Sequence, residues 1–276
     1  MTWLDDQKIP LGRWMKAFFD WIINSFPVFF ERIDDGLSFL IDGTLSVLEA
    51  VPALILAAAF CGLTWVLQRQ WSRVAIVGGC FLFVINQGYW DETMESLTLI
   101  LYACLVCMGV GVPIGIKAAH NAKFSRALRP LLDMMQTIPT FVYLIPMIAL
   151  FSIGMVPGLV ATCIFVLPAP IRLTELGVSS VPVALREAAL AFGATPRQVL
   201  AKVELPYAFP QIMAGLNQTI MLSLSMVVIA ALVGADGLGV PVVRALGSVN
   251  IALGFESGFV IVGVAIALDR MLKVER

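Results

Sequence analysis

The sequence predicts an all-α integral membrane protein, because long apolar runs dominate a chain of low charge. Of its 276 residues, 59% are hydrophobic and only 13% are charged, and the mean hydropathy is +0.92. A soluble domain typically has about 45–50% apolar and about 25% charged residues. The formal net charge of -1 offers no basic surface for nucleic acid, so we expect no nucleic-acid partner.

Seven stretches have the length and composition of membrane spans, which need about 20 mostly apolar residues. They cover residues 45–67, 74–90, 94–116, 137–154, 157–176, 208–233 and 257–272. Several contain proline or glycine, which membrane helices tolerate when neighbouring groups satisfy the freed backbone. We therefore expect about seven transmembrane helices.

Residues 1–44 precede these stretches and predict an amphipathic helical segment. Polar residues recur at helical spacing from Arg13 to Asn24, and tryptophan and phenylalanine occupy the other faces. Pro27 should kink or end the first helix. The segment either lies in the interface at the outer membrane surface or packs on the membrane bundle, and periodicity alone does not separate these alternatives.

Lysine and arginine are concentrated in one set of loops, which predicts the orientation in the membrane. This set contains Arg69, Arg73, Lys117, Lys123, Arg126, Arg129, Arg172, Arg186, Arg197, Lys202, Arg270, Lys273 and Arg276. The opposite set contains Arg244 beside Asp91, Glu92, Glu95, Asp236 and Glu256. The basic set should be cytoplasmic, so an odd number of spans places the N-terminus outside and the C-terminus inside a bacterial cytoplasmic membrane.

A charged, alanine-rich stretch at residues 181–206 interrupts the apolar pattern and predicts two short helices at an angle. Pro182 suits the first turn of a helix, where its missing N–H costs nothing. Gly193 suits the position after a helix, where a positive φ is wanted. Thr195 and Gln198 have the spacing of a capping box, in which each side chain bonds the backbone N–H of the other.

The second short helix is expected to run to about Glu204 and to be ended by Leu205 and Pro206. Two short helices joined at an angle would form a compact knob on the cytoplasmic side. Such a knob is suited to docking another protein, although an ordinary helical loop would show the same pattern.

The stretch EAALAFGATPRQVLAKVELP resembles the EAA motif of permease subunits of bacterial ABC importers. The motif consists of E-A-A, three residues, glycine, nine residues, an aliphatic residue, one residue and L-P. Its positions in this chain are Glu187, Ala188, Ala189, Gly193, Val203, Leu205 and Pro206. The resemblance implies that the hairpin is a coupling helix, which sits in a groove of a cytoplasmic ATPase and transmits its movement to the membrane helices. We include the neighbouring Arg186 and Ala194 in this expected ATPase-coupling set.

Three longer stretches are similar to the glycine betaine, proline and choline permeases in particular. They are MMQTIPTFVYLIPMIALFSIG (134–154), VPGLVATCIFVLPAPIRLTELGV (156–178) and IMAGLNQTIMLSLSMVVIAALVG (212–234). The resemblance implies a type I ABC importer permease core of five helices over residues 93–276, preceded by two accessory helices over 45–92. The segment GADGLG (234–239) departs from the pattern, because relatives often have glycine at the position of Asp236.

The resemblance also implies the function and the partners. The expected function is the permease subunit of an ATP-driven importer for glycine betaine or a related solute, such as choline, proline betaine or trimethylamine N-oxide. The alternative is a permease of an ABC importer for a different small solute. The chain has no Walker A pattern G-x-x-x-x-G-K-[ST], so we expect no enzyme activity and no cofactor in it. ATP and magnesium should bind a partner, a cytoplasmic ABC ATPase dimer. The other expected partners are a periplasmic or lipid-anchored substrate-binding protein, a second copy of the permease, and membrane lipid.

Polar residues in the sixth stretch are candidates for the solute pathway. Gln218, Met221 and Ser225 share one face of a helix. Polar groups in a membrane helix either face a cavity or form hydrogen bonds between helices, and both interpretations remain open here. The complete set of pathway candidates is Gln136, Thr140, Asn217, Gln218, Met221 and Ser225.

Other classes of function explain the sequence less well. An ion-coupled secondary transporter would need charged residues near the middle of a span, which the seven stretches lack. A membrane enzyme would need a cluster of catalytic groups, whereas the chain has one histidine. A non-transporting scaffold would keep the docking hairpin but would leave the polar face at 218–225 unexplained.

The cysteines and the histidine have simple interpretations. Cys104 and Cys107 form a CxxC pattern, but it has no second pair and no histidine nearby, so we expect neither a metal site nor a redox site. His120 lies in the basic loop KAAHNAKFSRALRP and is expected to be solvated or close to lipid headgroups.

Overall fold

The computed structural model describes residues 9–272, and this part of the chain consists of helices, turns and short connections without a strand. In chain order the helices are α1 (Leu11–Ser25), α2 (Pro27–Glu49), α3 (Ala53–Gln68), α4 (Trp71–Gln87), α5 (Trp90–His120), α6 (Ala122–Thr137), α7 (Thr140–Phe151), α8 (Met155–Val166), α9 (Pro168–Ser179), α10 (Val183–Ala191), α11 (Pro196–Val199), the π-helical turn η1 (Leu200–Glu204), α12 (Leu205–Ala230), the 3-10 turn η2 (Ala231–Val233), α13 (Gly239–Gly247) and α14 (Ile251–Leu272). The all-α prediction is therefore confirmed. Lys273 and Arg276, which contributed to the predicted orientation, and residues 1–8 lie outside the described part.

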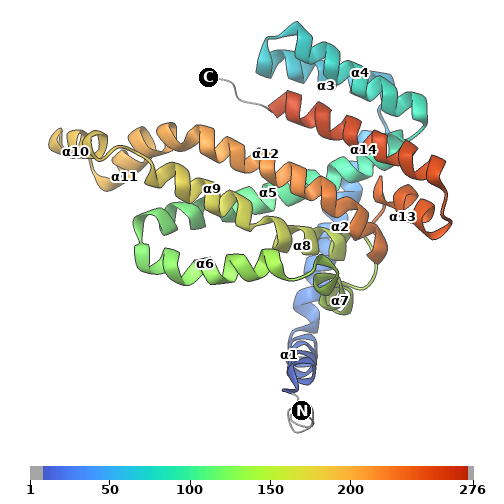
Figure 1. Ribbon diagram of the computed structural model, residues 1–276, viewed down its shortest axis with the longest axis horizontal. Helices are drawn as coiled ribbons and strands as arrows, with labels where there is room; N and C mark the ends of the chain where they lie inside the picture. Colours follow the sequence, from blue (N-terminus) through green and yellow to red (C-terminus); the bar gives the residue numbers. More distant parts are fainter. Residues whose placement is uncertain (1–8, 273–276) are drawn as a thin grey trace, which may run out of the picture.

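Helices α5, α9 and α12 lie side by side along the long axis and form the centre of the molecule (Figure 1). Small residues permit this close packing. A Cβ atom added to Gly115 of α5 would lie 2.6 Å from the backbone oxygen of Ile171 in α9. A Cβ atom added to Gly177 of α9 would lie 2.8 Å from Cβ of Gln211 in α12. Because membrane helices gain their packing energy from close contact, the two glycines set the spacing of this trio.

The number of straight spans is smaller than the seven that the sequence predicts. Among the described residues, four helices or continuous helix pairs are long and apolar enough to cross a membrane: Trp90–His120, Met155–Ser179, Pro196–Val233 and Ile251–Leu272. The number rises to six if each of two sharply bent pairs counts as one span. Helix α4 is apolar but has only 17 residues.

Two predicted spans are not straight helices, because proline interrupts each of them. The expected span at 45–67 is divided between α2 and α3, which meet at an angle of 103° before Pro52. The boundary expected between residues 44 and 45 therefore falls inside α2. The expected span at 137–154 is broken at Pro139, where α6 and α7 meet at 92°. Proline has no N–H to continue the preceding helix, and it pushes the residue before it toward an extended conformation.

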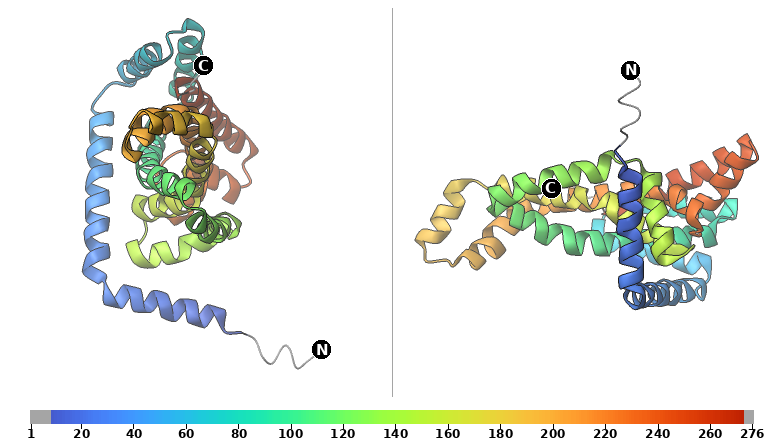
Figure 2. Two further views of the ribbon diagram at one scale, coloured as in Figure 1. Left: turned by 90° about the vertical axis from the view of Figure 1, so that its left-hand side faces the viewer. Right: turned by 90° about the horizontal axis from the view of Figure 1, so that it is seen from below.

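Helices α1 and α2 form an arm that crosses the long axis of the bundle (Figures 1 and 2). Pro27 separates them, as the sequence predicts. Helix α2 packs on the bundle through Ile41, which is 1% exposed and belongs to a cluster with Leu99 of α5 and Leu159 of α8. Helix α1, whose 15 residues are all described, has no buried residue. The N-terminal segment thus combines a part that packs on the bundle with a part that extends away from it.

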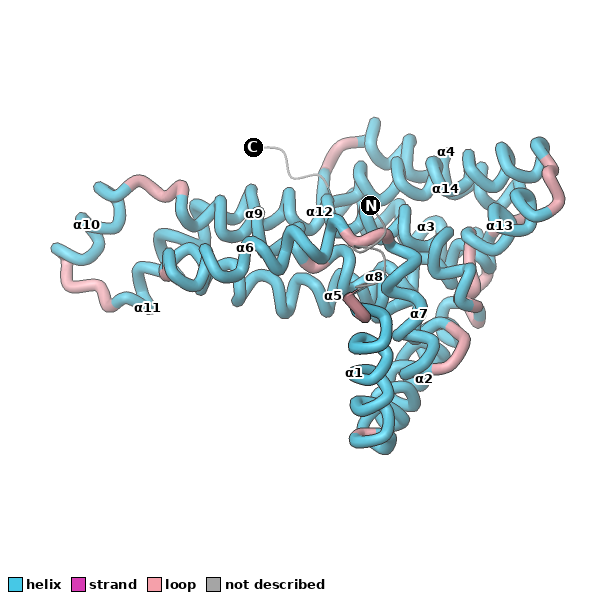
Figure 3. The backbone as a smooth tube through the Cα atoms, turned by 60° about the horizontal axis from the view of Figure 1, so that its bottom comes forward, coloured by secondary structure: helices cyan, strands magenta, loops and turns pink. Residues whose placement is uncertain are grey.

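Helices α3, α4 and α14 form a second group beside the central trio (Figure 1). Phe81 of α4 and Ala267 of α14 are fully buried in the cluster that joins them. The helical hairpin of α10 and α11 projects from one end of the bundle, and α13 lies at the other end (Figures 1 and 3). These two ends carry the candidate functional features.

Candidate functional site

The projecting hairpin has the local structure that its sequence predicts. Helix α10 ends before Gly193, which has a φ of +85°. A capping box then starts α11: the backbone N–H of Thr195 donates to Oε1 of Gln198 at 2.8 Å, and the N–H of Gln198 donates to Oγ1 of Thr195 at 3.4 Å. The two bonds satisfy backbone donors that the short helix cannot satisfy itself. The hairpin is therefore a defined structure and not an irregular loop.

The end of the hairpin differs from the prediction. Leu205 and Pro206 do not end the second helix, because the π-helical turn at Leu200–Glu204 runs directly into α12. Pro206 is the second residue of α12 and lies just after this turn. The wider π turn takes up the irregularity that proline would otherwise force on a continuous α-helix. The hairpin and the long span α12 are therefore mechanically continuous.

The tip of the hairpin exposes apolar side chains. Phe192 is 93% exposed, and Val183 and Leu190 are more than half exposed. The expected ATPase-coupling residues extend from α10 to the first turn of α12: Glu187, Ala188, Gly193 and Pro206 are exposed, and Arg186, Ala189, Ala194, Val203 and Leu205 are half-buried. Exposed apolar residues at the tip of a projecting helix are characteristic of a surface that another protein covers.

A buried carboxylate at the base of the hairpin escaped the sequence analysis. The side chain of Glu204 is 4% exposed. Its Oε2 lies 2.8 Å from Nε2 of His120, at the end of α5, and its Oε1 lies 3.0 Å from Nε of Arg186 in α10. A terminal nitrogen of Arg186 also donates to the carbonyl oxygen of Val178 in α9 at 2.5 Å. His120 is exposed to solvent at 43% of its side chain, as the sequence predicts, but one ring nitrogen also contacts this buried carboxylate, which the sequence did not predict.

Ion pairs also tie α6 to α9 at this end of the bundle. Ser125 donates to Oε1 of Glu175 at 2.6 Å, and Arg129 lies 3.4 Å from the same oxygen. Arg172 pairs with Asp133 at 2.5 Å. The basic residues at the hairpin end therefore hold α6 and α9 together, in addition to producing the excess of positive charge in the loops.

The pathway candidates on α12 separate into two environments. Gln218 and Ser225 are exposed along the helix and Met221 is half-buried between them. Asn217 points elsewhere: its amide nitrogen donates to Oδ1 of Asp269 in α14 at 3.2 Å. Asn217 therefore joins two helices, whereas the other three form a stripe along one side of α12.

The two remaining pathway candidates lie where α6 bends into α7. Gln136 is exposed near the end of α6, and Thr140 is half-buried at the start of α7. Pro139 lies between them at the 92° bend. They belong to elements other than α12, so sequence position alone does not group them with its stripe.

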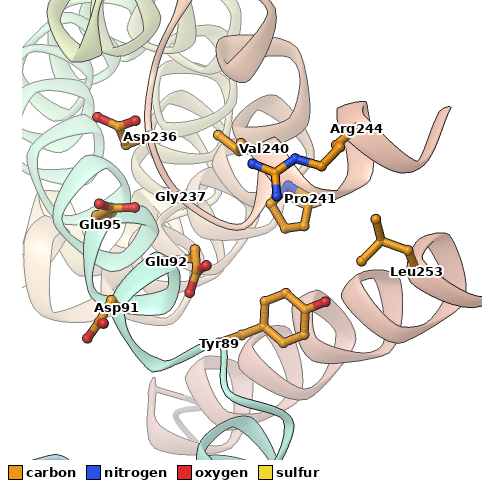
Figure 4. Close-up of a pocket in the computed structure, with 10 residues that line it drawn as sticks. All are labelled: Tyr89, Asp91, Glu92, Glu95, Asp236, Gly237, Val240, Pro241, Arg244 and Leu253. Atoms are coloured by element: carbon orange, nitrogen blue, oxygen red, sulfur yellow. The ribbon is translucent and has the colours of Figure 1, made fainter. Parts of the chain in front are cut away.

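An acidic pocket of about 310 Å³ lies at the end opposite the hairpin (Figure 4). Carboxylates from the start of α5 and from the loop before α13 face this pocket together with one arginine. Its lining includes Asp91, Glu92, Glu95, Asp236 and Arg244. Tyr89 closes one side: burial, together with a hydrogen bond to Glu256, raises the pKa of Tyr89. The two ends of the molecule therefore carry opposite charge, as the loop pattern predicts.

The GADGLG loop is fixed against α5 beside this pocket. Gly237 has a φ of +121°, and a Cβ atom there would lie 2.5 Å from Oγ of Ser96. That hydroxyl oxygen accepts a buried hydrogen bond from the N–H of Leu238 at 2.8 Å. Asp236, the position that departs from the family pattern, is exposed at the rim. Asp236 therefore adds a negative charge to the pocket, and its side chain lies outside the packed part of the loop.

Within residues 9–272, no three histidine, cysteine, aspartate or glutamate side chains gather as a metal site would require. Cys107 lies under α8 and contacts the carbonyl oxygen of Cys163 at 3.5 Å. The five cysteines are free thiols in the structure.

Comparison with known proteins agrees with this arrangement. Residues 111–269 match the family described as "Binding-protein-dependent transport system inner membrane component". The chain is 45% identical to the glycine betaine transport system permease protein OpuAB of Bacillus subtilis (strain 168), over 96% of this chain and 94% of the relative. It is 43% identical to the glycine betaine/proline betaine transport system permease protein ProW of Escherichia coli (strain K12), over 96% of this chain and 75% of the relative.

The fold is also similar to a solved chain of the MetNI methionine ABC transporter in an inward-facing conformation. The TM-score is 0.57 at 25% identity, over 64% of this chain and 89% of that chain. The helical bundle is thus the type I ABC importer permease fold that the sequence predicts. This chain belongs to the family of binding-protein-dependent transport system inner membrane components, the permease subunits of ABC importers.

Proposed function

We propose that this chain is the membrane permease subunit of an ATP-driven importer for glycine betaine or a related quaternary-amine solute. The projecting hairpin carries the proposal, because a defined helical knob with an exposed apolar tip continues directly into the span α12. The names of the two relatives, at 45% and 43% identity, support glycine betaine or proline betaine as the solute class.

The hairpin is proposed to dock on a cytoplasmic ABC ATPase dimer. ATP and magnesium belong to that partner, since this chain supplies the docking knob and no Walker A pattern. The exposed Phe192 would insert into the partner as an aromatic anchor, the kind of residue that dominates binding energy at interfaces. The ATP-driven closure of the ATPases would then act on α12 through the π turn.

The opposite end is proposed to face outward, toward a periplasmic or lipid-anchored binding protein. The excess of lysine and arginine at the hairpin end supports a cytoplasmic location for that end of the chain in the bacterial inner membrane. The acidic pocket would then lie at the outer surface. The N-terminus is outside and the C-terminus inside if the 17-residue helix α4 also crosses the membrane, because four or six spans alone would leave both termini on one side.

The polar stripe of α12 supports a pathway shared by two copies of the permease. Gln218 and Ser225 are exposed on a helix whose length and hydropathy are those of a membrane span. A polar side chain directed at lipid is costly, so such residues usually face a cavity or another protein chain. A homodimer around this stripe would cover it and give the solute a weakly binding route.

Reconstitution tests the proposal. Proteoliposomes would contain this chain, its ATPase and its binding protein, and ATP-dependent uptake of labelled glycine betaine would be measured with choline, proline betaine and trimethylamine N-oxide as competitors. Uptake that needs all three components is expected, and the order of competition would give the solute preference. Absence of ATPase association with the wild-type chain would contradict the proposal.

A further inference from the structure

Glu204 is the most deeply buried charged side chain at the hairpin end, at 3% exposure for the whole residue. Burying a carboxylate is costly unless it is paired and hydrogen-bonded. Here each carboxylate oxygen faces a different base: Oε1 lies 3.0 Å from Arg186, and Oε2 lies 2.8 Å from His120. An ionised carboxylate only accepts hydrogen bonds, whereas an imidazole N–H can donate one, so the two groups are complementary in this contact.

The cluster joins four elements of the fold. Glu204 is the last residue of the π turn and directly precedes α12. His120 is the last residue of α5, and Arg186 belongs to α10. Through its bond to the carbonyl oxygen of Val178, Arg186 also reaches α9. One carboxylate thus connects the hairpin with the inner ends of α5, α9 and α12, the central trio.

Helix α10 is not held on the bundle by buried apolar side chains, so these polar contacts are its main attachment. Helix α10, all of which is described, has no buried residue, and its packing neighbours are α11 and the π turn. The position of α10 relative to the bundle therefore depends on polar contacts, namely the ion pair between Arg186 and Glu204 and the hydrogen bond that Arg186 donates to Val178. A π-helical turn at the same point is a common sign of a functional site.

We propose that Arg186, Glu204 and His120 form a charge linkage, centred on the buried carboxylate of Glu204, that transmits movement of the docked hairpin to α5 and α12. The inference rests on the proposed function, because it assumes that an ATPase moves the hairpin. Glu204 acts as a positioning residue in this linkage: it holds Arg186 and His120 in one geometry, and it contacts neither solute nor nucleotide. Without its charge, the hairpin still docks, but its movement no longer carries α5 and α12 with it.

The test uses the reconstituted complex with the full-length chain. Glu204→Gln removes the charge and keeps the size of the side chain. Basal ATP hydrolysis and recovery of the assembled complex are expected to stay within about twofold of wild type. Stimulation of ATP hydrolysis by solute-loaded binding protein and solute uptake should each fall about tenfold, which corresponds to about 1.4 kcal/mol. Glu204→Asp, which retains the charge, should restore at least half of the stimulation.

A double-mutant cycle tests the pairing itself. Arg186→Gln alone should lower stimulation, and in combination with Glu204→Gln it should cause little further loss, because both changes break one contact. Asp133→Asn is the matched control: its carboxylate is paired with Arg172 at the same end but its side chain is 64% exposed. Exposed ion pairs contribute little to stability, so this variant should show stimulation within about twofold of wild type.

Two results would overturn the linkage. If ATP hydrolysis is stimulated as strongly in Glu204→Gln as in Asp133→Asn, the buried charge does not transmit movement. A parallel loss of complex, basal hydrolysis and uptake, which Glu204→Asp does not restore, would assign Glu204 a purely structural role. Failure of the proposed function would be recognised separately, because the wild-type chain itself would then fail to bind the ATPase or to transport.

Discussion

Replacement of Gly193 tests whether the shape of the hairpin, as distinct from its side chains, determines coupling. Gly193 has a φ of +85°, and a Cβ atom added there would meet nothing within 4 Å. A larger residue therefore causes no collision with neighbouring side chains or backbone. Its effect comes from backbone strain alone, since residues with a Cβ atom rarely adopt this region.

The magnitude follows from that strain. A residue other than glycine in the left-handed region costs about 1–3 kcal/mol, with β-branched residues at the upper end and asparagine at the lower end. At about 1.4 kcal/mol per tenfold change, Gly193→Val should reduce the fraction of correctly shaped hairpin by roughly 30-fold or more. Gly193→Ala should have an intermediate effect, and Gly193→Asn should be close to wild type.

The assay is stimulation of ATP hydrolysis by solute-loaded binding protein in proteoliposomes, with thermal unfolding of the purified permease as the control. The unfolding midpoint should hardly change, because Gly193 lies at the exposed end of α10 and outside the packed bundle. The order wild type, asparagine, alanine, valine is the expected result. Equal stimulation by all four chains would refute the argument from φ, and a loss in the asparagine variant as large as in the valine variant would assign the effect to a lost contact.

Three further predictions concern other parts of the chain. Gln218→Leu should lower the rate of solute uptake while the ATPase stays bound, because it removes an exposed polar group from α12; unchanged uptake would exclude this stripe from the pathway. Gly115→Ala should destabilise the permease by about 1–3 kcal/mol in thermal unfolding, because its Cβ atom would lie 2.6 Å from the backbone oxygen of Ile171. An unchanged unfolding midpoint would show that α5 and α9 separate freely. Thr195→Ala should destabilise the hairpin by about 1 kcal/mol through loss of its helix cap. The expected result is a modest fall in stimulated ATP hydrolysis, which Thr195→Ser restores. Full stimulation of ATP hydrolysis in Thr195→Ala would show that the cap is dispensable.

The local structure of the hairpin could be predicted because its signals are short-range. The capping box needs only Thr195 and Gln198 at a spacing of three, and Gly193 marks a positive φ by itself. The continuation through Pro206 was not predictable in this way. Proline usually ends a helix, and only the π turn before it, in a packed bundle, allows the backbone to pass directly into α12.

The bends at Pro52 and Pro139 likewise could not be predicted from the hydropathy of the spans. Hydropathy measures how apolar a stretch is and not whether its axis is straight, so a run of about 20 apolar residues predicts one span where the structure has two helices at a steep angle. The polar stripe at Gln218, Met221 and Ser225 was predictable from helical periodicity. Asn217 instead bonds Asp269, because α14 packs beside this part of α12. Helical periodicity carries no information about which other helix packs there.

By itself, the sequence determined the features that arise within a few turns of chain: an all-α membrane protein, opposite charge at its two ends, a capped helical hairpin and the family to which its motif points. Tertiary structure alone decided which residues from distant segments meet. His120 and Glu204 are 84 positions apart, and Arg186 approaches the same carboxylate from a third segment. Their meeting at the buried carboxylate of Glu204 results from the packing of α5, α9 and α12, because long-range contacts depend on how helices pack in space and not on the spacing of residues along any one of them.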